Sequence, residues 1–286
     1  MAQESIGKEG VLYLCATPIG NLGDISLRVL DILREVDLIA AEDTRNSIKL
    51  LNHFKINKPL TSYHEYNKYD KARELADKLH KGENVALVTD AGTPAISDPG
   101  EVLVRLCREE GITVTSLPGP CAVITALSAS GISARRFCFE GFLPSDKRER
   151  QRIISELNDE TRTIILYEAP HHLLKTLKEL YESLGERELV LCRELTKKHE
   201  EYKRLLLSEA IGFYETEQAR GEFVLVIEGR DPLELKKERE ASFQDLSVKE
   251  HVKHYEAMGY DRKESMKLAA KDRGVSKRDI YNSLLD

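Results

Sequence analysis

Two short polar segments of the sequence carry residue types that acid–base chemistry requires. They are AEDTR (41–45), with Glu42, Asp43 and Arg45, and SYHEYN (62–67), with His64, Glu65 and Asn67. A carboxylate or an imidazole can accept a proton from a reacting group, whereas an arginine stays protonated and can hold an anion. The two segments therefore predict the substrate side of a catalytic site. A structural alternative stays open, because Asp43 or Thr44 could cap the following helix and a lone histidine is more often structural.

Segments rich in glycine, proline or acidic residues follow four apolar runs. They are ATPIGN (16–21), AEDTR (41–45), TDAGTP (89–94) and LPGP (117–120). If the runs are parallel strands, these endings lie along one edge of a sheet, where open α/β sheets bind their ligands. Each segment alone could be a tight strand-to-helix turn, but four on one edge favour a binding cleft. A side chain larger than alanine at position 91 or 92 would keep the backbone away from a ligand.

The sequence lacks the common motifs of nucleotide-binding proteins and hydrolases. A P-loop, GxGxxG, GxSxG and HExxH are all absent from the sequence. A ligand would therefore rely on backbone amides and carbonyls, apolar contact and shape. This suits a nucleoside with an amino-acid tail, or a cationic sulfonium beside a carboxylate such as Asp90. No cluster of side chains demands a metal.

The elements that position these segments alternate between strands and helices. Short runs rich in Val, Ile and Leu predict strands at 11–16, 36–41, 84–89 and 112–117, and again at 137–142, 163–169, 189–195 and 223–229. Helical patterns lie between them, at 24–36, 69–82, 171–184 and around 208–220. This alternation predicts an α/β fold with a largely parallel sheet in its first half.

The chain is expected to divide into four parts. Residues 1–120 form an N-terminal α/β domain, and residues 121–231 form a second α/β domain. Residues 232–246 are charged and without an apolar face, which indicates a linker, and residues 247–286 form a helical module. Ser276, three residues before Asp279, is expected to cap the last helix. The segment 266–285 resembles a helix-turn-helix, although a packing module fits its balanced charges better.

The amino-acid composition limits the classes of protein to which the chain can belong. The chain has 286 residues, 41% hydrophobic and 32% charged, with a net charge of −6, which describes a globular protein without a generally basic surface. Its five cysteines are scattered, odd in number and without a CxxC pair, so reduced thiols are expected. No apolar leader and no membrane-spanning stretch occur, and a cytoplasmic location without membrane association is expected.

Long sequence strings, in order, resemble one family. They are LYLCATPIGNLGDISLRVLDILREVDLIAAEDTRNS (12–47), SYHEYN (62–67), VTDAGTPAISDPG (88–100), SLPGPCAVITALSASGI (116–132), EGFLP (140–144), YEAPHHLLKTL (167–177), CRELTKKHEE (192–201) and GEFVLVIEG (221–229). This arrangement is similar to the RsmI-type small-subunit ribosomal RNA ribose 2'-O-methyltransferases. These are class III S-adenosylmethionine enzymes of the tetrapyrrole-methylase superfamily. The resemblance covers residues 11–230, and the helical module also fits.

The resemblance implies two α/β domains with S-adenosylmethionine in the cleft between them, and a homodimer. It implies methyl transfer to the ribose 2'-hydroxyl of a decoding-centre cytidine in 16S rRNA, within the small ribosomal subunit. Carried onto this sequence, it predicts a set of cofactor-binding residues. They are Thr17, Pro18, Gly20, Asp90, Ala91, Gly92, Thr93, Pro94, Pro118, Gly119, Ala122, Thr125, Ala126, Tyr167 and Ala169.

Several alternatives stay open at this point. Glu42, Asp43, His64 and Glu65 are all candidates for the base, and the sequence does not rank them. The basic run at 147–152 is either a solvated helix face or an RNA contact. A tetrapyrrole C-methyltransferase is the main alternative function, although ATPIGN replaces the GxGPG-type first loop of those enzymes. A non-catalytic RNA- or ribosome-binding factor is the other alternative.

Overall fold

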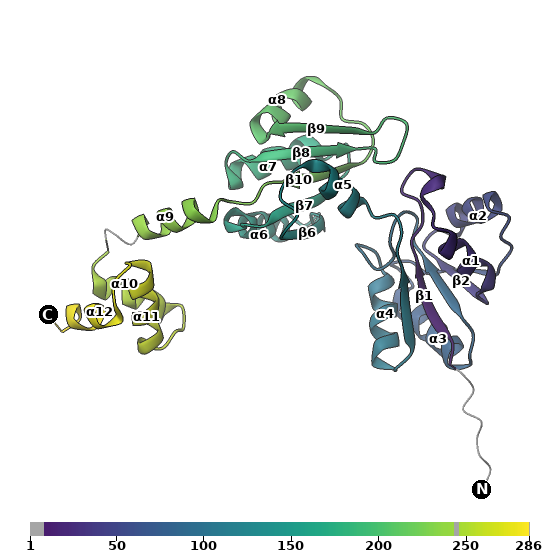
Figure 1. Ribbon diagram of the computed structural model, residues 1–286, viewed down its shortest axis with the longest axis horizontal. Helices are drawn as coiled ribbons and strands as arrows, with labels where there is room; N and C mark the ends of the chain where they lie inside the picture. The colour runs from purple at the N-terminus through teal and green to yellow at the C-terminus, as the bar shows by residue number, and fades with distance from the viewer. Residues whose placement is uncertain (1–8, 243–245, 286) are drawn as a thin grey trace, which may run out of the picture.

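The computed structural model describes residues 9–242 and 246–285, which form two five-stranded sheets followed by a run of helices (Figure 1). The strands are β1 (Val11–Cys15), β2 (Leu38–Ala41), β3 (Leu60–Ser62), β4 (Val85–Val88), β5 (Thr113–Leu117), β6 (Phe137–Phe142), β7 (Thr163–Glu168), β8 (Glu188–Arg193), β9 (Glu201–Leu206) and β10 (Phe223–Ile227). The helices are α1 (Leu27–Glu35), α2 (Thr44–His53), α3 (Lys68–His80), α4 (Gly100–Glu109), α5 (Ala122–Ser130), α6 (Lys147–Glu156), α7 (Leu173–Leu184), α8 (Leu207–Thr216), α9 (Pro232–Ser242), α10 (Val248–Ala257), α11 (Arg262–Asp272) and α12 (Lys277–Ser283). Two 3-10 turns are η1 (Leu22–Asp24) and η2 (Leu157–Asp159).

The first sheet is parallel throughout, in the order β3-β2-β4-β1-β5. Strands β2 and β4 are buried at every position, as expected when helices cover both faces of a parallel sheet. Helices α3 and α4 pack on one face, and α1 and α2 pack on the other. All strands of this sheet point the same way, so the four expected polar endings do share one edge.

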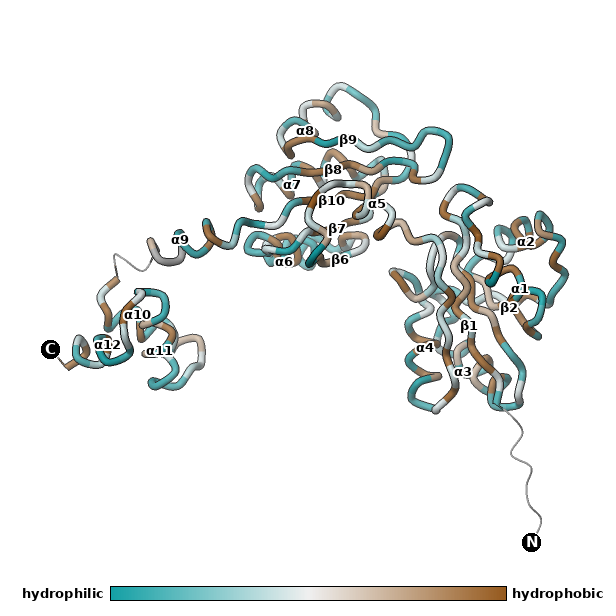
Figure 2. Tube along the Cα trace, viewed as in Figure 1, coloured by the Kyte–Doolittle hydropathy of each residue, from teal (hydrophilic) through white to brown (hydrophobic). Residues whose placement is uncertain are grey.

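The second sheet is mixed, in the order β6-β7-β10-β8-β9. Strand β6 runs parallel to β7, and the other neighbouring pairs are antiparallel. Helices α6, α7 and α8 cover one face, while the other face packs against α5. Figure 2 shows hydrophobic residues gathered along the strands of both sheets. The α/β prediction, with two sheet-containing units, is confirmed.

Two strands and one helix were not predicted. Strand β3 has three residues, too few for a period, and β9 is an edge strand on which half-buried residues alternate with exposed ones such as Tyr202 and Arg204. The expected linker 232–246 begins with helix α9, because its Glu and Lys residues favour helix without any apolar face. Arg230 fixes the start of this helix by pairing with Asp159 at 3.0 Å and with Glu238.

The basic run at 147–152 lies on α6, and its members differ in their surroundings. Arg150 is buried, and its guanidinium donates to Glu179 Oε2 at 2.6 Å and to Thr176 Oγ1 at 2.6 Å. Arg152 pairs with Glu156 one turn further along the helix. The RNA-contact interpretation therefore fails for Arg150, because its charge is used to compensate buried acids inside the second unit.

Helices α10, α11 and α12 pack around a small apolar core of their own, which includes Val252, Ala269 and Ile280. The Ser276 side chain accepts a hydrogen bond from the Asp279 amide, so the predicted cap of the last helix is confirmed. Within the two described ranges, none of the helices has the length and apolar character needed to cross a bilayer.

Candidate functional site

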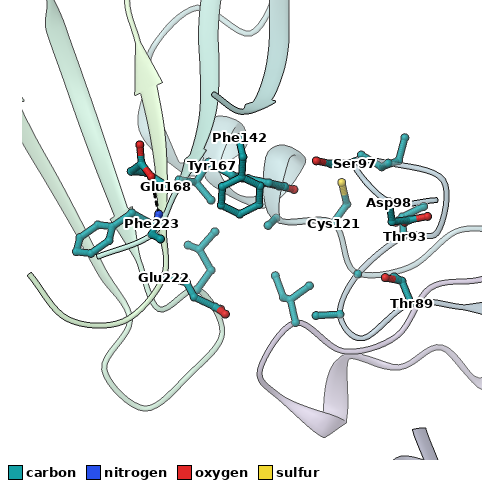
Figure 3. Close-up of a pocket in the computed structure, with 18 of the residues that line it drawn as sticks. Thr89, Thr93, Ser97, Asp98, Cys121, Phe142, Tyr167, Glu168, Glu222 and Phe223 are labelled. Carbon is teal, nitrogen blue, oxygen red and sulfur yellow. Dashed lines mark hydrogen bonds between the residues drawn. The ribbon is translucent and has the colours of Figure 1, made fainter. Parts of the chain in front are cut away.

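A cavity of about 440 Å³ lies beyond the carboxyl edge of the first sheet, where the second sheet faces it. Figure 3 shows Thr89, Thr93 and Asp98 of the first sheet's loops on one side, and Tyr167, Glu168 and Phe223 of the second sheet on the other. The lining residues are Ile19, Glu42, Thr89, Ala91, Gly92, Thr93, Ile96, Ser97, Asp98, Cys121, Ala122, Phe142, Tyr167, Glu168, Ala169, Pro170, Leu195, Glu222, Phe223 and Val224. The two units therefore share one cavity.

The floor of this cavity is held by a backbone pair between the loops after β1 and β4. The Thr17 amide donates to the Gly92 carbonyl at 2.9 Å, and the Gly92 amide donates to the Thr17 carbonyl at 3.0 Å. The Thr17 hydroxyl also donates to the Thr89 carbonyl at 3.1 Å. Gly92 has φ of +88°, and a Cβ there would lie 3.3 Å from Ile19 Cγ2. The backbone conformation therefore favours glycine, and an added side chain would also be crowded by Ile19.

The loop from Thr93 to Asp98 carries a locally strained backbone along the cavity wall. Ala95 and Ser97 have φ of 66° and 64°, which is uncommon for residues other than glycine. Asp98 stabilises this shape, because its Oδ1 accepts from the Ala95 amide at 3.0 Å and from the Gly100 amide at 2.7 Å. The sequence favours Asp98 as the cap of the next helix, α4, but the N-cap residue is Pro99, and Asp98 accepts the Gly100 amide from the position before it.

The other Asp98 oxygen, Oδ2, is buried and has no hydrogen-bond partner in the described part of the chain. Burial raises the pKa of this carboxyl above its usual value, and the nearby charge of Glu42 adds to the effect. Backbone strain, as at Ala95 and Ser97, and a buried unpaired polar atom, such as Asp98 Oδ2, occur most often at functional sites of proteins.

The second unit supplies an aromatic wall. The Tyr167 ring lies 4.9 Å from that of Phe139 and 5.4 Å from that of Phe142, measured between centroids. Burial raises the pKa of Tyr167 to about 12, so the ring stays neutral. The neighbouring Glu168 is buried, and its Oε1 accepts the Ala169 amide at 2.8 Å. This wall can cover a planar ring system by stacking and apolar contact.

The acidic residues at the end of β2 divide between two environments. Glu42 lines the cavity, and its Oε2 accepts the Thr89 hydroxyl at 2.7 Å. Asp43 caps α2, where its Oδ1 accepts the Arg45 amide at 2.8 Å, and the Arg45 side chain binds both carboxylate oxygens. These hydrogen bonds lower the pKa of Asp43 to about 2. Asp43 is thus a cap and a poor proton acceptor, which corrects its candidacy as a base.

Asp90 does not line the cavity, contrary to the expectation from the sequence. Its Oδ1 accepts the Asp43 amide at 3.2 Å, and its Oδ2 accepts the Asn46 side-chain amide at 3.2 Å. It lies instead in the wall of a neighbouring hollow of about 350 Å³, together with Thr17, Pro18 and Gly20. Asp90 therefore orients the start of α2 rather than the contents of the cavity.

The segment SYHEYN is not brought to the cavity. The Asn67 side chain closes a local turn, accepting the His64 amide at 2.8 Å and donating to the Ser62 carbonyl at 3.2 Å. Glu65 pairs with Lys68. His64 Nδ1 is buried without a hydrogen-bond partner among the described residues. Neither His64 nor Glu65 belongs to the cavity wall, so the structure gives neither of them access to it.

The expected cofactor residues fall into three groups. Those in the cavity wall are Ala91, Gly92, Thr93, Ala122, Tyr167 and Ala169. Those in the neighbouring hollow are Thr17, Pro18, Gly20 and Asp90. Pro94, Pro118, Gly119, Thr125 and Ala126 line neither. Ala126 is fully buried in the core, and a Cβ at Gly119 would lie 2.7 Å from Ala16 Cβ, so these two serve close packing.

Some lining residues were missed, namely Ile19, Ile96, Ser97, Cys121, Phe142, Leu195, Glu222, Phe223 and Val224. Ile19 and Cys121 lie in the loops that follow strands β1 and β5, so their place in the sequence could have indicated that they line the cavity. Leu195, Glu222 and Phe223 come from the second sheet, whose pairing with the first sheet's loops has no signal in the sequence.

The chain is similar in sequence to one protein family and to several named bacterial proteins. Residues 11–211 match the family model of the tetrapyrrole (corrin/porphyrin) methylases. The chain is 48% identical to ribosomal RNA small subunit methyltransferase I of Halalkalibacterium halodurans, and 48% identical to the protein of that name in Bacillus subtilis. Each alignment covers 96% of this chain and 94% of the relative. It is 47% identical to the namesake in Synechocystis, over 97% of this chain and 98% of that one.

Solved structures share the fold at low identity. Uroporphyrin-III C-methyltransferase from Thermus thermophilus superposes with a TM-score of 0.54 at 19% identity, covering 76% of this chain and 94% of that one. The methyltransferase CobJ gives 0.58 at 18% identity, covering 78% and 95%. A Thermus thermophilus uroporphyrin-III C-methyltransferase complexed with S-adenosyl homocysteine gives 0.53 at 16%, covering 76% and 97%.

The ion pair at the start of α2 makes a titration prediction. Replacing Arg45 with Gln should raise the pKa of Asp43 from about 2 toward its ordinary value of 3.8, because the hydrogen bonds from the guanidinium dominate the shift. Since the folded pKa is the depressed one, any stability from the pair exists above 3.8 and is lost as the pH falls through about 2. Carboxyl ¹³C chemical shifts followed against pH would report it.

Lys49→Gln is the matched control, because Lys49 is an exposed cation of the same helix that shows no contact with Asp43. If the pKa of Asp43 stays near 2 in Arg45→Gln, the helix terminus, and not the guanidinium, keeps this carboxyl ionised.

Proposed function

The chain belongs to the tetrapyrrole (corrin/porphyrin) methylase family, and from that premise we propose that it transfers a methyl group from S-adenosylmethionine to the ribose 2'-hydroxyl of a decoding-centre cytidine in 16S rRNA. Relatives that align over nearly the whole chain, and that are named for ribosomal RNA small subunit methylation, support the substrate. The main structural support for this reaction is that Glu42, a possible base, lies in the wall of a cavity shared by both units.

The cavity residues fit the proposed cofactor. Ala91, Gly92 and Thr93 would hold it along a backbone that approaches closely, and Tyr167 with Ala169 would cover its ring system. Two further lining carboxylates, Asp98 and Glu222, suit a ligand that carries positive charge. The complex of a structural neighbour with S-adenosyl homocysteine supports the same cofactor. When bound, S-adenosylmethionine supplies an activated methyl group on a cationic sulfur.

The chain's own task is then alignment and proton removal. A ribose hydroxyl is a weak nucleophile at neutral pH, and a base that takes its proton during attack increases the rate. Of the four candidates, Glu42 lines the cavity, whereas Asp43 is held by Arg45 and both His64 and Glu65 lie outside the wall. Glu42 is thus the proposed base. The Thr89 hydroxyl, which donates to it, orients the carboxylate and leaves its second oxygen for the substrate.

The proposal extends to the remaining expectations of partner and location. The substrate would be the small ribosomal subunit or its RNA, in the cytoplasm, and the enzyme would act as a homodimer. A tetrapyrrole C-methyltransferase stays as the second candidate, because the solved structures with this fold include such enzymes. The ribosomal RNA methyltransferases that are nearly half identical to this chain favour the RNA substrate over a tetrapyrrole. The solved tetrapyrrole methyltransferases are less than one fifth identical to it.

Methyl transfer tests the function directly. We expect the purified protein to move labelled methyl from S-adenosylmethionine to unmodified small ribosomal subunits, and to a single ribose when the product is mapped. The same assay with free 16S rRNA, and with precorrin-type tetrapyrroles, separates the alternatives. Label on a tetrapyrrole and none on RNA would replace the proposal with the second candidate, and label on a base would contradict the 2'-hydroxyl acceptor.

Gly92→Val should remove cofactor binding. The side chain would enter the space beside Ile19 and Pro120, so we expect the affinity for S-adenosylmethionine to fall at least tenfold, which corresponds to about 1.4 kcal/mol. Isothermal calorimetry measures it. Gly111→Val is the control, because Gly111 also has positive φ, at +78°, but has no atom within 4 Å of its Cβ position. Equal affinity in the folded Gly92→Val variant would place the cofactor elsewhere.

Glu42→Gln should separate catalysis from binding. Removing a base should reduce methyl transfer on the order of 100-fold or more. The affinity for S-adenosylmethionine should stay near that of the parent, because the amide has the same size and still contacts Thr89. Glu65→Gln is the control, as a carboxylate of the same unit outside the cavity wall. A small effect of Glu42→Gln on single-turnover rate, or a large effect of Glu65→Gln, would overturn the assignment.

A further inference from the structure

Helix α2 and the segment that follows it have an unusual charge pattern for this chain. Asp and Glu outnumber Lys and Arg by 49 to 43 overall, yet no acidic residue occurs from position 44 to position 64. The same stretch contains Arg45, Lys49, Lys55 and Lys58. A local excess of positive charge on an acidic protein indicates a surface that meets an anionic partner.

These cations are largely free of internal partners. Lys49 and Lys55 are exposed, and neither they nor Lys58 form an ion pair with a carboxylate whose side chain the structure describes. Arg45 pairs with Asp43, but its side chain is 86% exposed. Arg150 and Arg152 of α6 are engaged by acids, as Arg45 is by Asp43. On α2, Lys49 therefore has the charge that is available for a ligand.

The helix also forms one wall of the hollow of about 350 Å³ that adjoins the cavity. Asn46, Lys49 and His53 line it from α2, while Pro18, Gly20 and Leu22 line it from the loop after β1 and from η1. Arg45, Lys49 and His53 follow at intervals of four residues, so they lie along one helix face over about 12 Å. The hollow is thus a groove whose α2 wall carries Lys49 and His53, with Arg45 on the same helix face outside the lining, and whose other wall is more apolar.

The groove leads to the proposed catalytic carboxylate. Thr89 lines both the groove and the cavity, and its hydroxyl donates to Glu42. Asp90, at the same end of the groove, is fixed by donors from Asp43 and Asn46. A carboxylate fixed in this way can accept a hydrogen bond from an exocyclic amino group, which is how Asp or Glu contacts cytosine. Phosphates, in turn, are held by lysine and arginine.

We propose that this groove is the acceptor subsite, which binds single-stranded RNA with its phosphates along α2 and the target nucleoside beside Asp90 and Thr89. The inference rests on the proposed function and assigns the substrate side of the same site. RNA fits better than an acidic protein, because the basic face borders a hollow of nucleoside size that opens next to the cofactor cavity. A protein surface would need no such hollow.

The experiment removes one cation of the groove. For Lys49→Gln, we expect the KM for small subunits to rise about fivefold, while kcat and the affinity for S-adenosylmethionine stay within twofold, because a phosphate contact contributes to binding and not to chemistry. Binding of a fluorescein-labelled single-stranded oligoribonucleotide should weaken similarly, and its salt dependence, as log Kd against log salt, should lose about 0.7 in slope. Lys49→Arg should restore most of the affinity.

Lys81→Gln is the matched control, an exposed lysine of the same unit at the opposite edge of the sheet, next to the start of β4. Parent-like KM and salt slope in Lys49→Gln would overturn the subsite. A raised KM on assembled subunits with unchanged oligoribonucleotide binding would overturn it in favour of a ribosomal protein contact. Failure of the proposed function is distinguishable, because the parent enzyme itself would then methylate no RNA.

Discussion

The backbone pair between Thr17 and Gly92 is the contact on which the site depends. It joins the loops after β1 and β4, which are neighbours in the sheet although Thr17 and Gly92 are 75 positions apart in the chain, and it directs Ile19 and Gly20 toward the second unit. A Cβ at Gly20 would lie 2.9 Å from Thr196 Oγ1 and 3.1 Å from the Leu195 carbonyl, so the second unit rests directly on this loop. Without the pair, the two walls of the cavity would have no fixed separation.

The same edge of the sheet explains how neighbouring acids acquire different tasks. Glu42 and Asp43 follow one strand, and successive side chains of an extended segment point in opposite directions. Glu42 therefore reaches the cavity and Thr89, whereas Asp43 turns to the amino terminus of α2 and to Arg45. The helix terminus and the guanidinium both favour the ionised form of Asp43. A strand-to-helix junction thus separates a carboxylate that lines the cavity from one that caps a helix.

Much of the first sheet could be predicted from sequence, because buried parallel strands are continuous apolar runs and their endings must meet at one edge. That reasoning located Gly92 and Glu42, which line the cavity, whereas Tyr167 of the second sheet was expected only from the family resemblance. It misplaced Asp90, since nothing in the residue order shows that the start of α2 would satisfy its carboxylate. It also missed β9 and Leu195, which depend on pairing at the edge of the second sheet. Tertiary contacts, and not local propensity, decide such positions.

The division of the site between two units has a consequence for specificity. The cofactor cavity is built from both sheets, so its shape depends on their docking. The groove along α2 is built from the first unit alone, by residues at the ends of β1 and β4 and by one helix face. Its α2 residues can therefore change without disturbing the contact between the sheets, whereas Gly20, which lines the groove and contacts the second unit, cannot. A fold of this kind can keep one methyl donor while the acceptor changes, because the two ligands are held by parts of the chain that are under different structural constraints.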